Sequence, residues 1–216
     1  PVALGDLPKW LTQAVIAVED RRFNHHFGVD PRAVLRALFA NLKRGEVVQG
    51  GSTITQQLAK NLYANMSERT WPRKAWETLA AFGIEAFRSK SEILERYLNQ
   101  VYLAQRGPIS IIGIGAASRH YFGKDARYLD LDESALLAGL IQSPGRYHPY
   151  RNPETALERR NLVLRLMRDE GFVTDEAYRQ AAARPLRLRP EPPSDVREAP
   201  YVGEHVADEL KRLGLR

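Results

Sequence analysis

The chain contains no cysteine, which excludes disulfide bonds and thiolate metal sites. Its longest apolar runs, Ile111 to Ala117 and Ala135 to Ile141, are far shorter than the ~18 residues needed to span a bilayer. The five histidines are adjacent or scattered, without the spacing of a metal site. A Walker loop, a G-x-G-x-x-G loop and an S-x-x-K acyl-transfer motif are also missing. The motifs of several common enzyme classes are therefore absent.

The composition is that of a globular protein, with 44% hydrophobic and 27% charged residues. At 216 residues the chain can form one large domain, or one domain with an appendage. Its net charge of +6 is compatible with nucleic acid, anionic lipid headgroups or a phosphorylated substrate. Between Asp30 and Lys74, eight basic residues stand against three acidic ones. The charge is therefore concentrated in one region.

That basic region also carries apolar residues at helical spacing, from Val34 and Leu35 through Leu38 and Phe39 to Leu42, followed by Val47 and Val48. A basic amphipathic segment of this kind can lie in a membrane interface. The alternative is a core helix whose arginines are solvated. The pattern favours the membrane interface by a small margin.

Hydrophobic periodicity is helical almost throughout, and no run alternates convincingly enough to predict a strand. Several helix starts carry capping or first-turn signals, including Pro72 at a first helical position, Asp132 and Thr174 as caps, and Asn152-Pro153. The expected helices cover Leu7 to Val18, Pro72 to Phe87, Ile93 to Val101, Asp132 to Leu140, Asn152 to about Gly171, and a segment that begins at Thr174.

The composition changes at Pro185, since five prolines fall between residues 185 and 200. This segment is typical of an extended linker. A short helical pattern from Val202 to Leu213 follows it. The chain also opens at Pro1 without a signal peptide, and we expect a fragment of a longer protein.

The stretch Gly50 to Asn61 is the most informative part of the chain. Its two glycines allow backbone amides to approach a ligand closely. Thr53 and Gln56 have the T-x-x-Q spacing of a capping box, which predicts a helix start. Gln57 and Lys60 add an amide and a cation. Such a helix N-terminus suits an oxygen-rich anionic ligand, although an ordinary capped surface helix explains the residues equally well.

Three charged clusters accompany this stretch. Glu19 and Asp20 end an apolar helix, where partial desolvation would suit a carboxylate to general-base catalysis; a solvated helix end is the alternative. Arg73, Lys74 and Glu77 share one side of a helix, which an exposed ion pair would also explain. The third cluster is an amphipathic helix from Lys90 to Asn99, in which packing is the stronger interpretation and Lys90 is the plausible ligand contact.

Taken together, the residues resemble one family, the peptidoglycan glycosyltransferase domain (glycosyltransferase family 51) of class A penicillin-binding proteins and monofunctional transglycosylases. The motif E-D-x-x-F-x-x-H-x-G is Glu19 to Gly28, and G-G-S-T-I-T-Q-Q is Gly50 to Gln57. R-K-x-x-E is Arg73 to Glu77, and K-x-x-I-L-E-x-Y-L-N is Lys90 to Asn99. The resemblance covers about residues 5 to 185. It departs from the family pattern only around Ala104 to Ser110, so no contacts are carried over there.

The resemblance implies that the domain polymerises lipid II into glycan strands with inversion and release of polyprenyl diphosphate. It implies Glu19 as the catalytic base and Glu77 as a second catalytic carboxylate, which orients cations or holds a divalent ion (Mg or Mn). No other cofactor is implied. The matching substrate-binding candidates are Asp20, His26, Ser52, Thr53, Gln56, Gln57, Lys60, Arg73, Lys74 and Lys90.

The expected fold is mainly α, with a lysozyme-like large lobe and a smaller, apolar, membrane-associated lobe. The glycosyltransferase domain would cover residues 1–184, with the small lobe at about 30–71, the linker at 185–200, and the start of a region leading to a transpeptidase domain at 201–216. The implied location is the outer face of the bacterial cytoplasmic membrane, with an N-terminal anchor in the full-length protein. The implied partners are lipid II, the growing glycan strand, the membrane surface and moenomycin-type inhibitors, and no nucleic acid.

Two rival functions stay open at this point. A lysozyme-like glycan-cleaving enzyme also uses two carboxylates on a helical scaffold, although it needs no cations to stabilise a diphosphate. A lipid- or cell-wall-binding module with vestigial catalytic residues would bind without turnover. Nucleic-acid binding explains only the charge.

Overall fold

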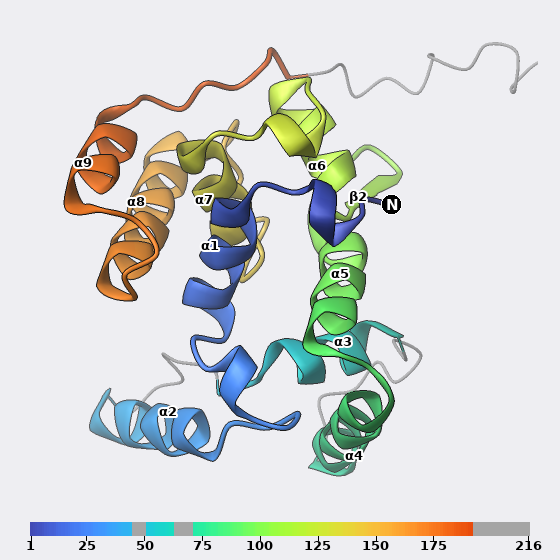
Figure 1. Ribbon diagram of the computed structural model, residues 1–216. Coiled ribbons are helices and arrows are strands. Elements are labelled where there is room, and N and C mark those ends of the chain that lie inside the picture. Colours follow the sequence, from blue (N-terminus) through green and yellow to red (C-terminus); the bar gives the residue numbers. More distant parts are fainter. Residues whose placement is uncertain (45–50, 63–70, 192–216) are drawn as a thin grey trace, which may run out of the picture.

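The computed structural model describes residues 1–44, 51–62 and 71–191. Helices dominate this part of the chain, joined by one short hairpin and three 3₁₀ turns (Figure 1). Val47 and Val48, the end of the predicted linker and the predicted helix at Val202 to Leu213 lie outside the described residues. The elements are η1 (Leu4–Asp6), α1 (Lys9–Glu19), η2 (Phe23–His25), α2 (Pro31–Arg44), α3 (Ile54–Leu62), α4 (Trp71–Phe87), α5 (Lys90–Gln100), β1 (Tyr102–Arg106), β2 (Ile109–Ile112), α6 (Ile114–Phe122), η3 (Ala126–Tyr128), α7 (Leu131–Leu140), α8 (Pro153–Asp169) and α9 (Asp175–Ala183).

Most helix starts lie where capping chemistry predicted them. Thr174 caps α9 by accepting a hydrogen bond from the amide of Ala177. The prediction for α7 was wrong by two residues, because Asp130 is the cap. Glu133 reaches back to the Asp130 amide at 2.7 Å and completes a capping box there, while Asp132 lies inside the helix. Pro72 is the second residue of α4 rather than the first.

The expectation that no strand would be found was wrong, since β1 and β2 form an antiparallel hairpin. Gly107, in the turn, has a φ of +52°, a left-handed conformation that glycine adopts without strain. A register shift between Tyr102 and Ala104 interrupts the pairing. Strands this short, with Tyr102 and Ile109 exposed, leave no regular alternation of apolar and polar residues in the sequence.

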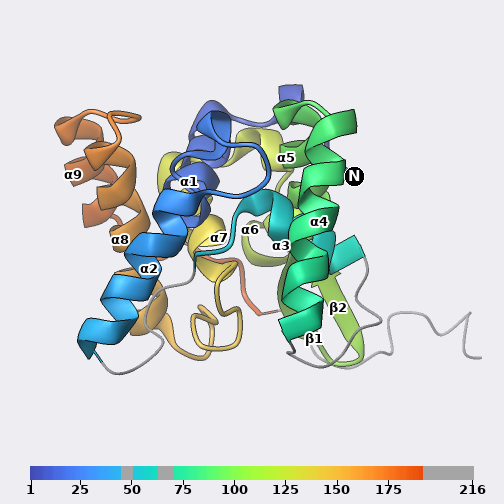
Figure 2. The same ribbon diagram turned by 90° about the horizontal axis from the view of Figure 1, so that it is seen from below.

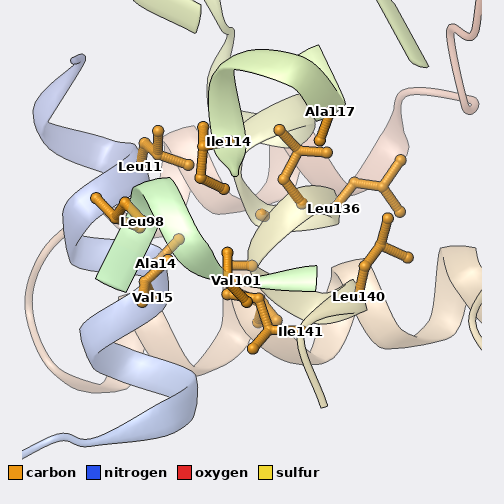
Figure 3. Packing of buried hydrophobic residues seen from close by; sticks show 14 of the residues in the cluster. Leu11, Ala14, Val15, Leu98, Val101, Ile114, Ala117, Leu136, Leu140 and Ile141 are labelled. Atoms are coloured by element: carbon orange, nitrogen blue, oxygen red, sulfur yellow. The ribbon is translucent and has the colours of Figure 1, made fainter. Parts of the chain in front are cut away.

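The core surrounds α1, which packs against α7 and α8. Leu11, Ala14 and Val15 on α1 are fully buried and belong to the same apolar cluster as Leu136 and Leu140 on α7 (Figure 3). The cluster also takes in side chains of α5 and α6. Residues from both ends of the described chain therefore stabilise a single core.

Helices α2, α3 and α4 gather at one end of the molecule, away from α6 (Figures 1 and 2). On α3, Ile54 and Leu58 are fully buried in the main core. On α2, by contrast, Val34 and Leu35 are about half exposed. A Cβ atom at Gly51 would lie 3.1 Å from the Cα of Val34, so glycine permits the close approach of this segment to α2.

The segment after α9 lies against the large part of the fold. The guanidinium groups of Arg184 and Arg187 pair with Asp132 at 3.0 and 3.3 Å. The amide of Arg189 donates to the carbonyl of Tyr121 at 2.9 Å. Residues 184–189, which include the beginning of the proline-rich stretch, are therefore anchored to α6 and α7.

Among the described ranges, no helix combines the length and the apolar character needed to cross a membrane.

Candidate active site

A cavity of about 390 Å³ opens beside the C-terminal end of α1. Its walls come from the end of α1, the first turns of α2, the start of α3 and the middle of α8, which are far apart in the sequence. The lining residues are Val18, Glu19, Asp20, Arg21, Asp30, Ala33, Arg36, Gly51, Ser52, Thr53, Gln57, Gln142, Arg159, Leu162 and Leu166.

Glu19 is the last residue of α1 and faces this cavity. Burial raises the pKa of its carboxyl group above the ordinary value, and the nearby charge of Asp20 adds to the rise. A hydrogen bond from Gln57 and the positive charge of Arg159 act in the opposite direction but do not cancel the effect of burial. A carboxylate that has lost part of its hydration is a stronger base, which suits it to accept a proton from a hydroxyl group.

The hydrogen bond from Gln57 also connects the Glu19 carboxylate to the core. The Gln57 Nε2 donates to the Glu19 Oε2 at 2.9 Å, and the hydroxyl group of Tyr97 donates to the Gln57 Oε1 at 2.9 Å. Tyr97, on α5, is fully buried. Gln57, a predicted substrate contact, therefore uses both ends of its amide group within the protein.

Asp20 and His26, both predicted substrate contacts, form a buried pair. The His26 Nε2 lies 2.9 Å from the Asp20 Oδ2, and both side chains are only 3% exposed. The same Asp20 oxygen accepts a hydrogen bond from the backbone amide of Ile54, at 3.1 Å. The start of α3, which the sequence suggested as a site for an anionic ligand, is therefore occupied by the chain's own carboxylate.

The predicted capping box at Thr53 and Gln56 is confirmed. The Thr53 amide donates to the Gln56 Oε1 at 3.1 Å, and the Gln56 amide donates to the Thr53 Oγ1 at 3.2 Å. The Thr53 hydroxyl group also donates to the carbonyl of Gly28, and the Gln56 Nε2 donates to Thr78. Both residues are at most 3% exposed, so they hold α3 against its neighbours.

The predicted cluster on α4 forms as expected. The Arg73 Nε lies 3.0 Å from one oxygen of Glu77, and the Lys74 Nζ lies 3.2 Å from the other. Lys74 also donates to the hydroxyl group of Ser52 at 2.9 Å, and Ser52 lines the cavity. Lys74 therefore lies at the edge of the cavity that contains Glu19, and Glu77 links Arg73 to it.

Glu77 is a poor candidate for a metal ligand in this arrangement. Each of its oxygens contacts a cationic side chain, and a divalent ion beside Arg73 and Lys74 would be repelled. Residues 1–44, 51–62 and 71–191 contain no group of three or more His, Asp or Glu side chains that could hold a metal ion. Orienting the two cations is therefore the role of Glu77 that the geometry supports.

The two remaining predicted contacts, Lys60 and Lys90, do not line the cavity of Glu19. Lys60 is exposed on α3. Lys90 lies outside the cavity of Glu19 and borders a separate, mainly apolar hollow of about 720 Å³. Its Nζ is 2.6 Å from Glu85 and 4.5 Å from the centre of the Phe23 ring, so Lys90 is engaged within the protein.

Five polar residues of the cavity were not among the predicted contacts: Arg21, Asp30, Arg36, Gln142 and Arg159. Arg36 belongs to the basic amphipathic segment whose sequence pattern slightly favours a membrane interface. Arg159 acts on Glu19 from α8, and its guanidinium group is 5.2 Å from the centre of the Tyr147 ring. Arg159 begins a run that matches the family, Arg159 to Leu164, but its spacing on an amphipathic helix gave it no role of its own.

Comparison with known proteins agrees with this geometry. The family model for transglycosylase matches residues 1–168. The chain is 48% identical over 190 residues to penicillin-binding protein 1A of Aquifex aeolicus, which covers 88% of this chain and 26% of that protein. It is 46% identical over 189 residues to penicillin-binding protein 1B of Escherichia coli, and this match covers 88% of this chain and 22% of that protein. The chain thus spans about a quarter of the length of these relatives.

A solved structure shows the same fold. The crystal structure of penicillin-binding protein 1A from Haemophilus influenzae aligns with 99% of this chain and 21% of that one, with a TM-score of 0.56 and 27% identity. The mostly helical, lysozyme-like architecture expected from the sequence is therefore confirmed. Together with the matched family model, these similarities show that the chain belongs to the transglycosylase family of the penicillin-binding proteins.

Proposed function

We propose that this chain polymerises lipid II into peptidoglycan strands. The observation that carries the proposal is the position of Glu19, a half-buried carboxylate with a raised pKa, in a cavity whose edge is reached by Lys74, which Glu77 links to Arg73. Membership of the transglycosylase family supports the same reaction. A neutral glycosidic bond could be cleaved without those cations, whereas a departing diphosphate requires them.

In this proposal Glu19 removes the proton from the 4-hydroxyl group of the acceptor sugar. The hydroxyl oxygen then forms a bond to the anomeric carbon of the donor strand, on the face opposite the leaving group. The bond from that carbon to the diphosphate oxygen breaks, and its electron pair leaves with the polyprenyl diphosphate. The proton stays on Glu19 until solvent accepts it. General-base assistance of this kind typically contributes ~10²–10⁴-fold to the rate.

Arg73 and Lys74 would stabilise the negative charge that grows on the departing diphosphate. Glu77 supports this role because it holds both cations in fixed positions, so little reorganisation is needed during the reaction. Lys60, exposed on the neighbouring helix, would add a third cation when substrate is bound. No step of the proposal depends on a metal ion.

Most of the remaining predicted contacts would hold the walls of the site in place rather than touch the substrate. Asp20, His26 and Thr53 join α1, α3 and the loop before α2, and Gln56 joins α3 to α4. Ser52 accepts a hydrogen bond from Lys74. Lys90 is engaged with Glu85 and would support the fold around Phe23.

We also propose that the end of the molecule formed by α2 meets the outer face of the bacterial cytoplasmic membrane. The exposed Val34 and Leu35, beside exposed arginines on the same helix, support this orientation. Lipid II and the growing strand would then reach the cavity from the membrane surface. Moenomycin-type inhibitors would compete for the same site. Residues 1–184 would form the catalytic domain, with the small lobe at about 30–71 and a linker at 185–200.

Incubation of the chain with lipid II and, separately, with finished peptidoglycan tests the proposal. We expect polymer from lipid II, none from Glu19→Gln at unchanged helix content, and no fragments from peptidoglycan. Fragments without polymer would establish a glycan-cleaving enzyme instead. Binding of lipid II by the wild-type chain without any product would establish a non-catalytic module.

A further inference from the structure

Three residues form a continuous hydrogen-bonded chain from the core to the cavity. The Tyr97 hydroxyl group contacts the Gln57 Oε1 at 2.9 Å, and the Gln57 Nε2 contacts the Glu19 Oε2 at 2.9 Å. The three side chains come from α5, α3 and α1, and the first is fully buried while the last faces the cavity.

The chemistry of the groups fixes the direction of these bonds. An ionised carboxylate only accepts hydrogen bonds, so Gln57 must present its NH₂ group to Glu19. Its carbonyl oxygen then points to α5 and needs a donor. Burial raises the pKa of Tyr97 well above the usual value, and the neighbouring charge of Glu19 raises it further. The neutral phenol, which can donate a hydrogen bond, is therefore favoured over the phenolate.

We propose that Tyr97 is a positioning residue that acts on Glu19 through Gln57. Its hydroxyl group donates to the carboxamide oxygen and so stabilises the orientation in which the NH₂ group of Gln57 faces the carboxylate. Gln57 then holds the Oε2 of Glu19, so that Oε1 accepts the proton of the acceptor hydroxyl group. This inference rests on the proposed function for its catalytic consequence, but the bonds themselves can be tested without turnover.

Other charged groups also face Glu19 and must be held constant in any test. Beside the larger effect of burial, the charge of Arg159 on α8 lowers the pKa of Glu19 and the charge of Asp20 raises it. Further charges around the cavity are those of Arg21, Asp30 and Arg36. Tyr97→Phe changes none of these charges, and it removes only one oxygen atom from the core.

The matched control is Tyr121→Phe. Tyr121, on α6, is also a fully buried tyrosine and does not line the cavity. Its hydroxyl group donates to the carbonyl of Leu103 at 3.3 Å. Both variants lose one buried hydroxyl group and one hydrogen bond. A difference between them in the properties of Glu19 therefore reports on the connection through Gln57.

The first measurement is a ¹³C NMR titration of the Glu19 carboxyl carbon in glutamate-labelled protein, assigned with Glu19→Gln. We expect the pKa of Glu19 to rise in Tyr97→Phe, because the hydrogen bond from Gln57 that stabilises the ionised form becomes weaker. Tyr121→Phe should leave it unchanged. An unchanged pKa of Glu19 in a folded Tyr97→Phe protein would overturn the inference.

The second measurement is the pH profile of lipid II polymerisation. Tyr97→Phe should lower kcat about ten-fold to a hundred-fold, shift the acidic limb to higher pH and leave KM nearly unchanged. Adding Tyr97→Phe to Gln57→Leu should cause little further loss, because both changes break the same connection. Additive losses would contradict the inference. Absence of polymer from the wild-type chain would reject the proposed reaction, while the NMR titration would still decide whether Tyr97 acts on Glu19.

Discussion

The carboxylate of Asp20 accepts a hydrogen bond from the backbone amide of Ile54, 34 positions further along the chain. This single contact closes the N-terminus of α3 with a negative charge and fixes α3 beside the end of α1. The same carboxylate binds His26, so three segments meet at one buried group. The position of Gln57 relative to Glu19 depends on these contacts of the Asp20 carboxylate.

Removal of the Asp20 carboxylate should destabilise the protein. We expect Asp20→Ala to lower the free energy of unfolding by about 3 kcal/mol, because His26 and the Ile54 amide lose a buried partner. Urea denaturation followed by circular dichroism would measure the change. Asp169→Ala, which removes a half-exposed carboxylate paired with Arg168, should have little effect. Equal losses in the two variants would show that the buried contacts add nothing.

Glu19→Gln should make the protein more stable at neutral pH. Burial raises the folded-state pKa of Glu19 above its value in the unfolded chain, so ionisation disfavours the folded state. Below the unfolded-state pKa both states are protonated, and this penalty is absent. The stabilising effect of the substitution should therefore grow as the pH rises through the folded-state pKa. Thermal unfolding of both proteins from acidic to neutral pH would show it, and a constant difference would contradict it.

Glu77→Gln should weaken substrate binding through the cations. Without the carboxylate, Arg73 and Lys74 lose the contacts that hold them at 3.0 and 3.2 Å. We expect the affinity for a polyprenyl diphosphate in detergent micelles to fall about ten-fold, as measured by fluorescence anisotropy.

Glu92→Gln is the matched control for this experiment. Glu92 has the same spacing to Arg88 as Glu77 has to Arg73, but this pair is exposed and lies away from the cavity. The control should bind like the wild type. A full loss in the control, or none in Glu77→Gln, would remove the basis for the assigned role.

Arg160→Leu should destabilise the packing of α9. Arg160 is 1% exposed, and its guanidinium group donates to the carbonyl of Ala182 at 3.0 Å and to Asn161 at 2.9 Å. Loss of these donors leaves polar groups without partners and should lower the free energy of unfolding by about 2–3 kcal/mol. Arg165→Leu changes an exposed residue of the same helix and serves as the control. Chemical denaturation of the two variants would distinguish them.

The sequence predicted the helices well because their signals are local. Apolar spacing and caps such as Thr53 and Thr174 depend on residues within four positions of each other. The hairpin of β1 and β2 was missed because its strands are short and half exposed, so burial leaves no regular alternation there.

The chemistry of the site was only partly predictable. An apolar helix that ends in two carboxylates made Glu19 a candidate beside the alternative of a solvated helix end, and its assignment as the base came from the resemblance. The contacts of Tyr97 with Gln57 and of Asp20 with Ile54 join residues 40 and 34 positions apart. Arg159 reaches the cavity from α8, which is further still. No spacing rule relates such pairs, because the three-dimensional packing of α1, α3, α5 and α8 alone brings them together.

The dependence of the cavity on α8 has a consequence during synthesis of the chain. Glu19 is made early, but the wall that carries Arg159, Leu162 and Leu166 is made much later. A nascent chain that stops before α8 lacks one side of the cavity and the core partners of α1. Because such distant contacts form late in folding, the ability to act on substrate should appear only when the domain is nearly complete.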